Sequence, residues 1–127
     1  LRPNDLKTIV NLGIAADALG HAAAAQEWYG KALQVAPDDS VAMCRMASSK
    51  YAQGKYDEAM SLLREVIRKK PGSYCAYFTL GVSFADAGLY RDAIRQWRKV
   101  VELAPTSPEA VSAKESIDVL EKFLQGH

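Results

Sequence analysis

Four of the five prolines in this chain stand 34 residues apart, and this period constrains the fold more than any other feature. The four are Pro3, Pro37, Pro71 and Pro105. Glycine and alanine recur with the same period, at Gly20, Gly54 and Gly88 and at Ala25, Ala59 and Ala93. A regular period of this length is typical of arrays that stack one supersecondary unit on the next. The sequence therefore predicts a repeat protein.

When the proline is counted as position 32 of the period, three repeats cover residues 6–39, 40–73 and 74–107. Apolar residues at positions 4, 7, 8 and 11 follow helical spacing, and those at positions 20, 21, 24, 27 and 28 do so again, with a glycine at position 15 between the two groups. Each repeat is therefore expected to form two antiparallel helices. We expect seven helices and no strand, over residues 6–19, 22–35, 40–53, 56–69, 74–87, 90–103 and 108–124.

Two columns of the repeat hold only small residues. Position 8 is Gly13, Ala47 and Gly81, and position 20 is Ala25, Ala59 and Ala93. Small side chains suit points where two helix axes approach closely, because a larger side chain would push the backbones apart. Position 24 is large and apolar instead, at Tyr29, Leu63 and Trp97.

The combination of a small position 8, alanine at position 20, a large position 24 and proline at position 32 resembles the tetratricopeptide repeat family. The resemblance covers nearly the whole chain and implies an all-α, right-handed superhelical solenoid of three 34-residue helix-turn-helix repeats. Position 11 departs from the family pattern, because it is Phe84 in repeat three but Ala16 and Lys50 in the other two. We therefore expect looser packing between repeats one and two.

Both ends of the chain fit this scheme, with residues 1–127 as a single domain. Residues 1–5 match the tail of a preceding repeat, so the chain is expected to begin within an array. Residues 108–127 predict an amphipathic C-terminal capping helix, which would cover the apolar face of the last hairpin. The alternative is that this helix opens a fourth repeat.

The sequence offers little catalytic chemistry. It contains two histidines, His21 and His127, and no Cys-x-x-Cys pair, phosphate-binding loop or dinucleotide fingerprint. We therefore expect no enzyme activity, no cofactor and no metal site. The formal net charge is +1, and no apolar run approaches the ~20 residues of a membrane span. Cys44 and Cys75 are expected to be free thiols, because helix axes ~8 to 10 Å apart put many facing Cα pairs beyond disulfide reach.

The family resemblance implies that the first helix of each repeat lines a concave groove, with contacts at positions 2, 5, 9 and 12. This groove and its neighbours give the candidate partner-binding residues Val10, Ile14, Val41, Cys44, Arg45, Tyr51, Cys75, Phe78 and Val82. The stripe is mostly apolar, which favours a non-catalytic scaffold that binds a partner helix or an extended apolar segment. Family members that clamp a C-terminal carboxylate use Lys, Asn and Arg here. Because Val10 and Ile14 occupy the first two of those columns, such a clamp is not expected.

Several alternatives stay open from the sequence alone. The apolar stripe could pack the superhelix, be covered by the parent chain or mediate self-association. The chain could also be a recruiting or regulatory segment of a larger enzyme whose catalytic domain lies outside it. The outer face carries basic residues, at Arg64, Arg68, Lys69 and Lys70 and at Arg91, Arg95, Arg98 and Lys99. Acidic residues interleave with them and stacking aromatics are missing, so a solvated charged face is favoured over nucleic-acid binding.

Overall fold

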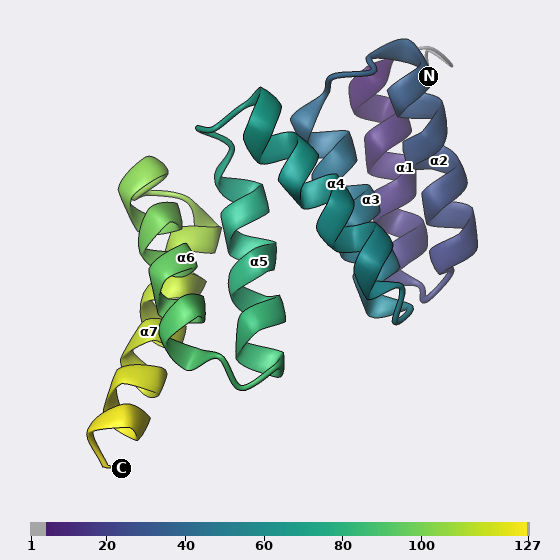
Figure 1. Cartoon of the computed structure of the whole chain (residues 1–127). Helices are drawn as coiled ribbons and strands as arrows, with labels where there is room; N and C mark the ends of the chain where they lie inside the picture. Colours follow the sequence, from purple (N-terminus) through teal and green to yellow (C-terminus); the bar gives the residue numbers. More distant parts are fainter. Residues whose placement is uncertain (1–4, 127) are drawn as a thin grey trace. The chain divides into compact units, whose positions relative to one another are not determined.

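The computed structural model describes residues 5–126, which form seven α-helices and no strand (Figure 1). The helices are α1 (Leu6–Ala18), α2 (Ala22–Val35), α3 (Ser40–Ala52), α4 (Tyr56–Lys69), α5 (Tyr74–Asp86), α6 (Tyr90–Leu103) and α7 (Pro108–Gln125). No helix end differs from the expected one by more than one residue, so the all-α repeat assignment is confirmed. The expected tail of a preceding repeat falls mostly on residues 1–4, outside the described residues.

The chain divides into two compact units, Leu1–Pro71 and Gly72–His127, and each is described by itself. In the first unit α1 pairs with α2 and α3 pairs with α4, while α3 also packs against α2 and touches α1. In the second unit α5 pairs with α6, and α7 packs against α6 and touches α5. Within its unit α7 therefore takes the place that the first helix of a following repeat takes in the first unit.

A glycine with positive φ turns the chain inside every hairpin. Gly20, Gly54 and Gly88 have φ values of 80°, 81° and 78°, in a region that glycine adopts without a steric penalty. The turn is closed by a hydrogen bond of 2.9 Å from the backbone N–H of His21 to the carbonyl oxygen of Ala16, and equivalent bonds close the other two turns. This is the Schellman ending of a helix, which explains why position 15 is glycine in all three repeats.

The first helices begin after the repeat boundary, where side chains cap their N-termini. Asp39 accepts a hydrogen bond of 2.9 Å from the backbone N–H of Ala42, and Ser107 accepts one of 3.0 Å from that of Ala110. Such caps satisfy backbone donors that have no partner inside the helix. Ser73 also precedes a helix but makes no cap bond, and its hydroxyl lies 3.0 Å from the sulfur of Cys75 instead.

The small residues at position 8 lie where the two helices of a hairpin meet. A Cβ atom added to Gly13 would overlap the ring of Tyr29, and one added to Gly81 would overlap the indole of Trp97. The second hairpin has the larger Ala47 at position 8 and the smaller Leu63 at position 24, and both are fully buried. The sizes at positions 8 and 24 therefore offset one another in the three hairpins.

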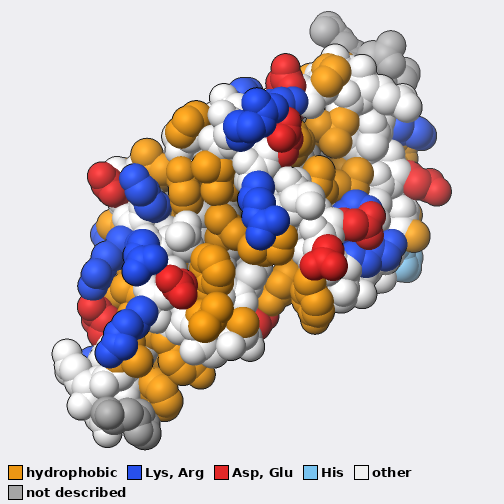
Figure 2. All heavy atoms as spheres, in the orientation of Figure 1, with side chains coloured by type: hydrophobic (Ala, Val, Ile, Leu, Met, Phe, Trp, Pro, Cys, Tyr) orange, Lys and Arg blue, Asp and Glu red, His pale blue; other side chains and the backbone are white. Residues whose placement is uncertain are grey.

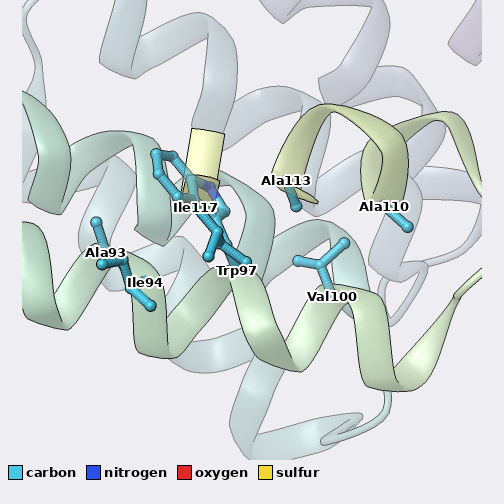
Figure 3. Packing of buried hydrophobic residues seen from close by; sticks show 7 residues of the cluster. All are labelled: Ala93, Ile94, Trp97, Val100, Ala110, Ala113 and Ile117. Atoms are coloured by element: carbon cyan, nitrogen blue, oxygen red, sulfur yellow. The ribbon is translucent and has the colours of Figure 1, made fainter. Parts of the chain in front are cut away.

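The core of the second unit joins α6 to α7 (Figure 3). Ala93, Ile94, Trp97 and Val100 come from α6, and Ala110, Ala113 and Ile117 come from α7. Alanines on both helices are fully buried, so the two backbones approach closely. Within the second unit, residues of α7 thus share one core cluster with the apolar face of α6.

The expectation of free thiols is wrong for the structure. Cys44 and Cys75 are both disulfide-bonded, and no free cysteine is found among the described residues. The expectation rested on the average distance between packed helix axes, and an average does not fix the separation of any one pair of side chains.

Candidate functional site

The predicted stripe on α1 is largely buried. Val10 is only 7% exposed and belongs to a core cluster with Ile9, Ala32 and Ala42, and Ile14 packs against the same cluster. Little of the Val10 side chain is left to contact a partner. On α1 the half-buried Ile14 is the more accessible of the two predicted residues.

The predicted residues on α3 differ widely in exposure. Val41 is 50% exposed and Arg45, one turn later, is exposed as well, whereas Cys44 is buried at 4%. Tyr51 is half-buried, and its ring lies edge-on to that of Tyr56 with 5.0 Å between the ring centroids. In the first unit the predicted contact surface therefore reduces mainly to Val41 and Arg45, with part of Ile14 and Tyr51.

The predicted residues on α5 are Cys75, Phe78 and Val82, and all three are half-buried. The inner sides of Phe78 and Val82 pack against the core cluster of the second unit. The backbone carbonyl of Phe78 also accepts a hydrogen bond of 3.2 Å from the indole nitrogen of Trp97. Phe78 is thus held in place by its own hairpin while part of its ring stays accessible.

Sequence reasoning missed a polar network that joins α1, α2 and α3. The hydroxyl of Tyr29 donates to one carboxylate oxygen of Asp17 at 2.8 Å, and Ser49 donates to the other at 2.9 Å. The side-chain amide of Gln26 donates to Ser49 at 3.3 Å and to Gln53 at 2.7 Å. This polar network lies where looser packing between repeats one and two was expected. Its signal in the sequence was Asp17, an acidic residue in a mostly apolar column.

The polar network has an electrostatic consequence for Tyr29. Burial raises the pKa of its hydroxyl well above the ordinary tyrosine value, and the hydrogen bond to the Asp17 carboxylate raises it further. Both effects disfavour a phenolate, because it would be desolvated and would lie beside a negative charge. Tyr29 is therefore a neutral donor, and its role in the network is structural.

Many of the basic residues on the outer face are paired with acids on the surface. Lys69 lies 2.8 Å from Asp38, and Arg68 lies 2.6 Å from Glu65. The hydrogen bond from Lys69 lowers the pKa of Asp38, and the hydrogen bond from Arg68 lowers the pKa of Glu65. Both shifts favour the charged carboxylate. Exposed pairs of this kind contribute little to stability.

Among residues 5–126 no cluster of three or more His, Cys, Asp or Glu side chains could hold a metal ion. None of the helices in that range combines the length and apolar character of a membrane span.

Comparisons with known proteins agree with the period in the sequence. A family model described as Tetratricopeptide repeat matches residues 50–117, and a second with the same description matches residues 10–74. The chain is 30% identical, over 84 residues, to Small glutamine-rich tetratricopeptide repeat-containing protein 2 of Mycosarcoma maydis. The matched region covers 66% of this chain and 24% of the relative. It is 29% identical, over 93 residues, to Protein O-mannosyl-transferase TMTC1 of Homo sapiens, covering 73% of this chain and 10% of the relative. The chain thus spans less than a quarter of the length of either relative.

Solved structures with the same helical arrangement support the fold. The first TPR of Spaghetti (RPAP3), bound to the HSP90 peptide SRMEEVD, matches with a TM-score of 0.79 and 18% identity, covering 98% of this chain and 99% of that one. The Sgt2 TPR domain from Aspergillus fumigatus matches with a TM-score of 0.78 and 21% identity, covering 98% and 81%. At these identities the likeness concerns the fold.

Proposed function

Because the chain belongs to the tetratricopeptide repeat family, we propose that it is a protein-interaction module that binds a partner helix or an extended apolar segment on its first-helix faces. The observation that supports this proposal is made in each unit by itself: α3 in the first unit and α5 in the second both carry accessible apolar side chains. Val41 is half exposed, and Phe78 and Val82 keep part of their area in solvent. Burying such area on binding contributes roughly 25 cal/mol per Å².

Two features favour a segment with apolar side chains over a terminal carboxylate. Val10 and Ile14 offer no charge, and Arg45 is the one cation among the nine candidate residues. A neighbouring family structure holds a peptide ending in EEVD, but that match has 18% identity and its ligand is a property of that protein. Arg45 can still contact an acidic residue flanking the apolar segment.

The proposal is tested by panning a phage-displayed library of short peptides against the immobilised chain. We expect the enriched peptides to share an apolar, helix-spaced motif. Binding of a synthetic copy should weaken about tenfold in Phe78→Ala and several-fold in Val41→Ser, because hot spots lie at desolvated apolar contacts. Affinity should change little between low and moderate salt.

A matched control is Val111→Ser, because Val111 on α7 is 55% exposed and lies outside the proposed contact surface. This variant should bind like the wild type. If peptide binding instead survives Val41→Ser and Phe78→Ala but is lost in Arg95→Ala and at raised salt, the first-helix faces are not the site. Thermal melting of Phe78→Ala, whose ring packs against the core, separates lost binding from lost folding.

A second candidate function is that the chain recruits substrates to a larger enzyme. One observation favours it. A relative is named as a mannosyl-transferase, and the region that matches this chain makes up only 10% of the length of that relative. Sequencing the full reading frame tests this directly. An appended catalytic domain would support recruitment, and a frame that encodes only helical repeats would oppose it.

A further inference from the structure

A second surface with different chemistry lies between α6 and α7, wholly within the second unit. A groove of about 630 Å³ opens there, and four basic and two acidic side chains line it. Volumes of this size accommodate a few side chains of a ligand. Figure 2 shows blue side chains gathered over this part of the molecule.

One stripe of α6 supplies the basic side chains. Arg91, Arg95 and Arg98 are spaced four and three residues apart, so they share one face of the helix, and Lys99 adjoins them. The accessible apolar lining comes mainly from Leu124 of α7, because Ile94 beneath it is only 5% exposed. The groove thus combines a basic rim with a small apolar patch.

Two of the four basic side chains of the rim form no ion pair in the described part of the chain. Arg95 lies 3.1 Å from Asp92, and Arg98 lies 2.5 Å from Glu121 of α7. Arg91 and Lys99 form no ion pair with any residue in the part of the chain that the structure describes. Two cations are therefore left to attract a ligand of opposite charge.

The hairpin fold itself does not require this charge. The residues of repeat two at the same positions are Asp57, Ser61, Arg64 and Glu65, and those of repeat one are Ala23, Glu27, Gly30 and Lys31. All of these positions lie on second helices, yet only repeat three makes them all basic. The basic rim is therefore a property of this groove and not of the repeat.

We propose that the groove between α6 and α7 binds an acidic segment of a partner protein, in which several Asp or Glu residues flank an apolar side chain. The carboxylates would pair with Arg91 and Lys99, and the apolar side chain would lie against Leu124. A nucleic acid fits less well, because Glu102 and Glu121 line the same groove and would repel a continuous row of phosphates.

The test uses a fluorescein-labelled peptide of four Glu-Glu-Leu triplets and measures its binding by anisotropy. A peptide of four Gln-Gln-Leu triplets has the same apolar content without charge and should not bind. The double variant Arg91→Glu/Lys99→Glu should weaken binding of the Glu peptide about tenfold or more, because two attractive contacts become repulsive. Amide shifts in NMR spectra should fall on α6 and α7 and spare α3.

The matched control is the double variant Arg64→Glu/Lys114→Glu, which changes the net charge by the same amount at exposed positions outside the groove. It should stay within about twofold of the wild type, since long-range charge is largely screened at physiological salt. Equal weakening by both double variants would show non-specific attraction and overturn the proposal. Tighter binding of a single-stranded oligonucleotide than of the Glu peptide would overturn it in favour of nucleic acid.

Discussion

In the first hairpin Tyr29 lies against Gly13, and in the third hairpin Trp97 lies against Gly81. The packing is alike, but the polar atom of each aromatic finds a different partner. Tyr29 donates to Asp17, which also accepts from Ser49 of the next hairpin, whereas Trp97 donates to a backbone carbonyl within its own hairpin. The same repeat position therefore couples neighbouring hairpins in one unit and closes a single hairpin in the other.

The largest effects are expected from larger side chains at the position-20 alanines, which the second and third hairpins should tolerate equally poorly. Ala93→Leu in the third hairpin and Ala59→Leu in the second should each lower the free energy of unfolding by ~1 to 3 kcal/mol, because overpacking a buried contact forces the helices apart. Both alanines are fully buried. Ala24→Leu, at a half-buried position, should be mild. Urea unfolding followed by circular dichroism gives the three values, and equal losses would refute the assigned register.

Replacing glycines by alanine should give the next largest effects. We expect the change to lower stability where the glycine lies against an aromatic ring and to raise it where the glycine faces open space. Gly13→Ala and Gly81→Ala should each destabilise by ~1 to 2 kcal/mol, because the new methyl group overlaps an aromatic ring. Gly30→Ala in α2 should instead stabilise by up to ~1 kcal/mol, since nothing lies near its Cβ direction and alanine is the better helix former. A stabilising Gly81→Ala would show that Trp97 is free to move aside.

The polar network is tested by the serines at position 10 of repeats two and three. Ser49→Ala should cost ~1 to 2 kcal/mol, because it leaves a partly buried oxygen of Asp17 without its donor. Ser83→Ala should be close to neutral, since the Ser83 hydroxyl bonds only to the backbone carbonyl of Thr79 in the same helix. Calorimetry of the two variants makes the comparison. A neutral Ser49→Ala would mean that water replaces the hydroxyl.

The smallest effect is a pH dependence confined to the first hairpin. Because the folded pKa of Tyr29 is raised, its contribution to stability is fully present below pH ~10 and is lost as the pH rises above that value, where the unfolded tyrosine ionises. The unfolding free energy should fall more steeply above pH ~10 in the wild type than in Tyr29→Phe, by at most ~1.4 kcal/mol per pH unit. Trp97 does not titrate, so Trp97→Phe should leave the slope unchanged. Parallel slopes for wild type and Tyr29→Phe would contradict the assignment.

The fold was predictable from the sequence because the period sets every hairpin, turn and boundary independently. Glycine at position 15, proline at position 32 and the helical spacing of apolar residues all indicate the same helix ends. The candidate site was less predictable. A column position places Val10 and Val41 on the same face, but it does not reveal that Val10 fills the core while Val41 stays exposed. The polar network escaped prediction because Asp17, Ser49 and Gln26 come from three different helices, and no spacing along the sequence relates them.

The capping role expected for α7 stays a prediction, and one residue supports it. Glu115 occupies position 8 of the repeat register and is exposed. In the three hairpins that position is glycine or alanine because the second helix lies close to it. A charged side chain there would keep a further helix from packing as α2 packs on α1.

The reciprocal sizes at positions 8 and 24 determine which pieces of this chain can be exchanged when repeats are recombined. A helix that carries Trp97 or Tyr29 needs a partner helix with glycine, whereas the hairpin that carries Leu63 has a fully buried Ala47 at the position of that glycine. Transplanting α6 onto α3 would drive an indole into a methyl group, and transplanting α4 onto α5 would leave a void beside Gly81. The modular element of this protein is accordingly the complete two-helix pair, and a chimera should be cut at the prolines and not at the glycine turns.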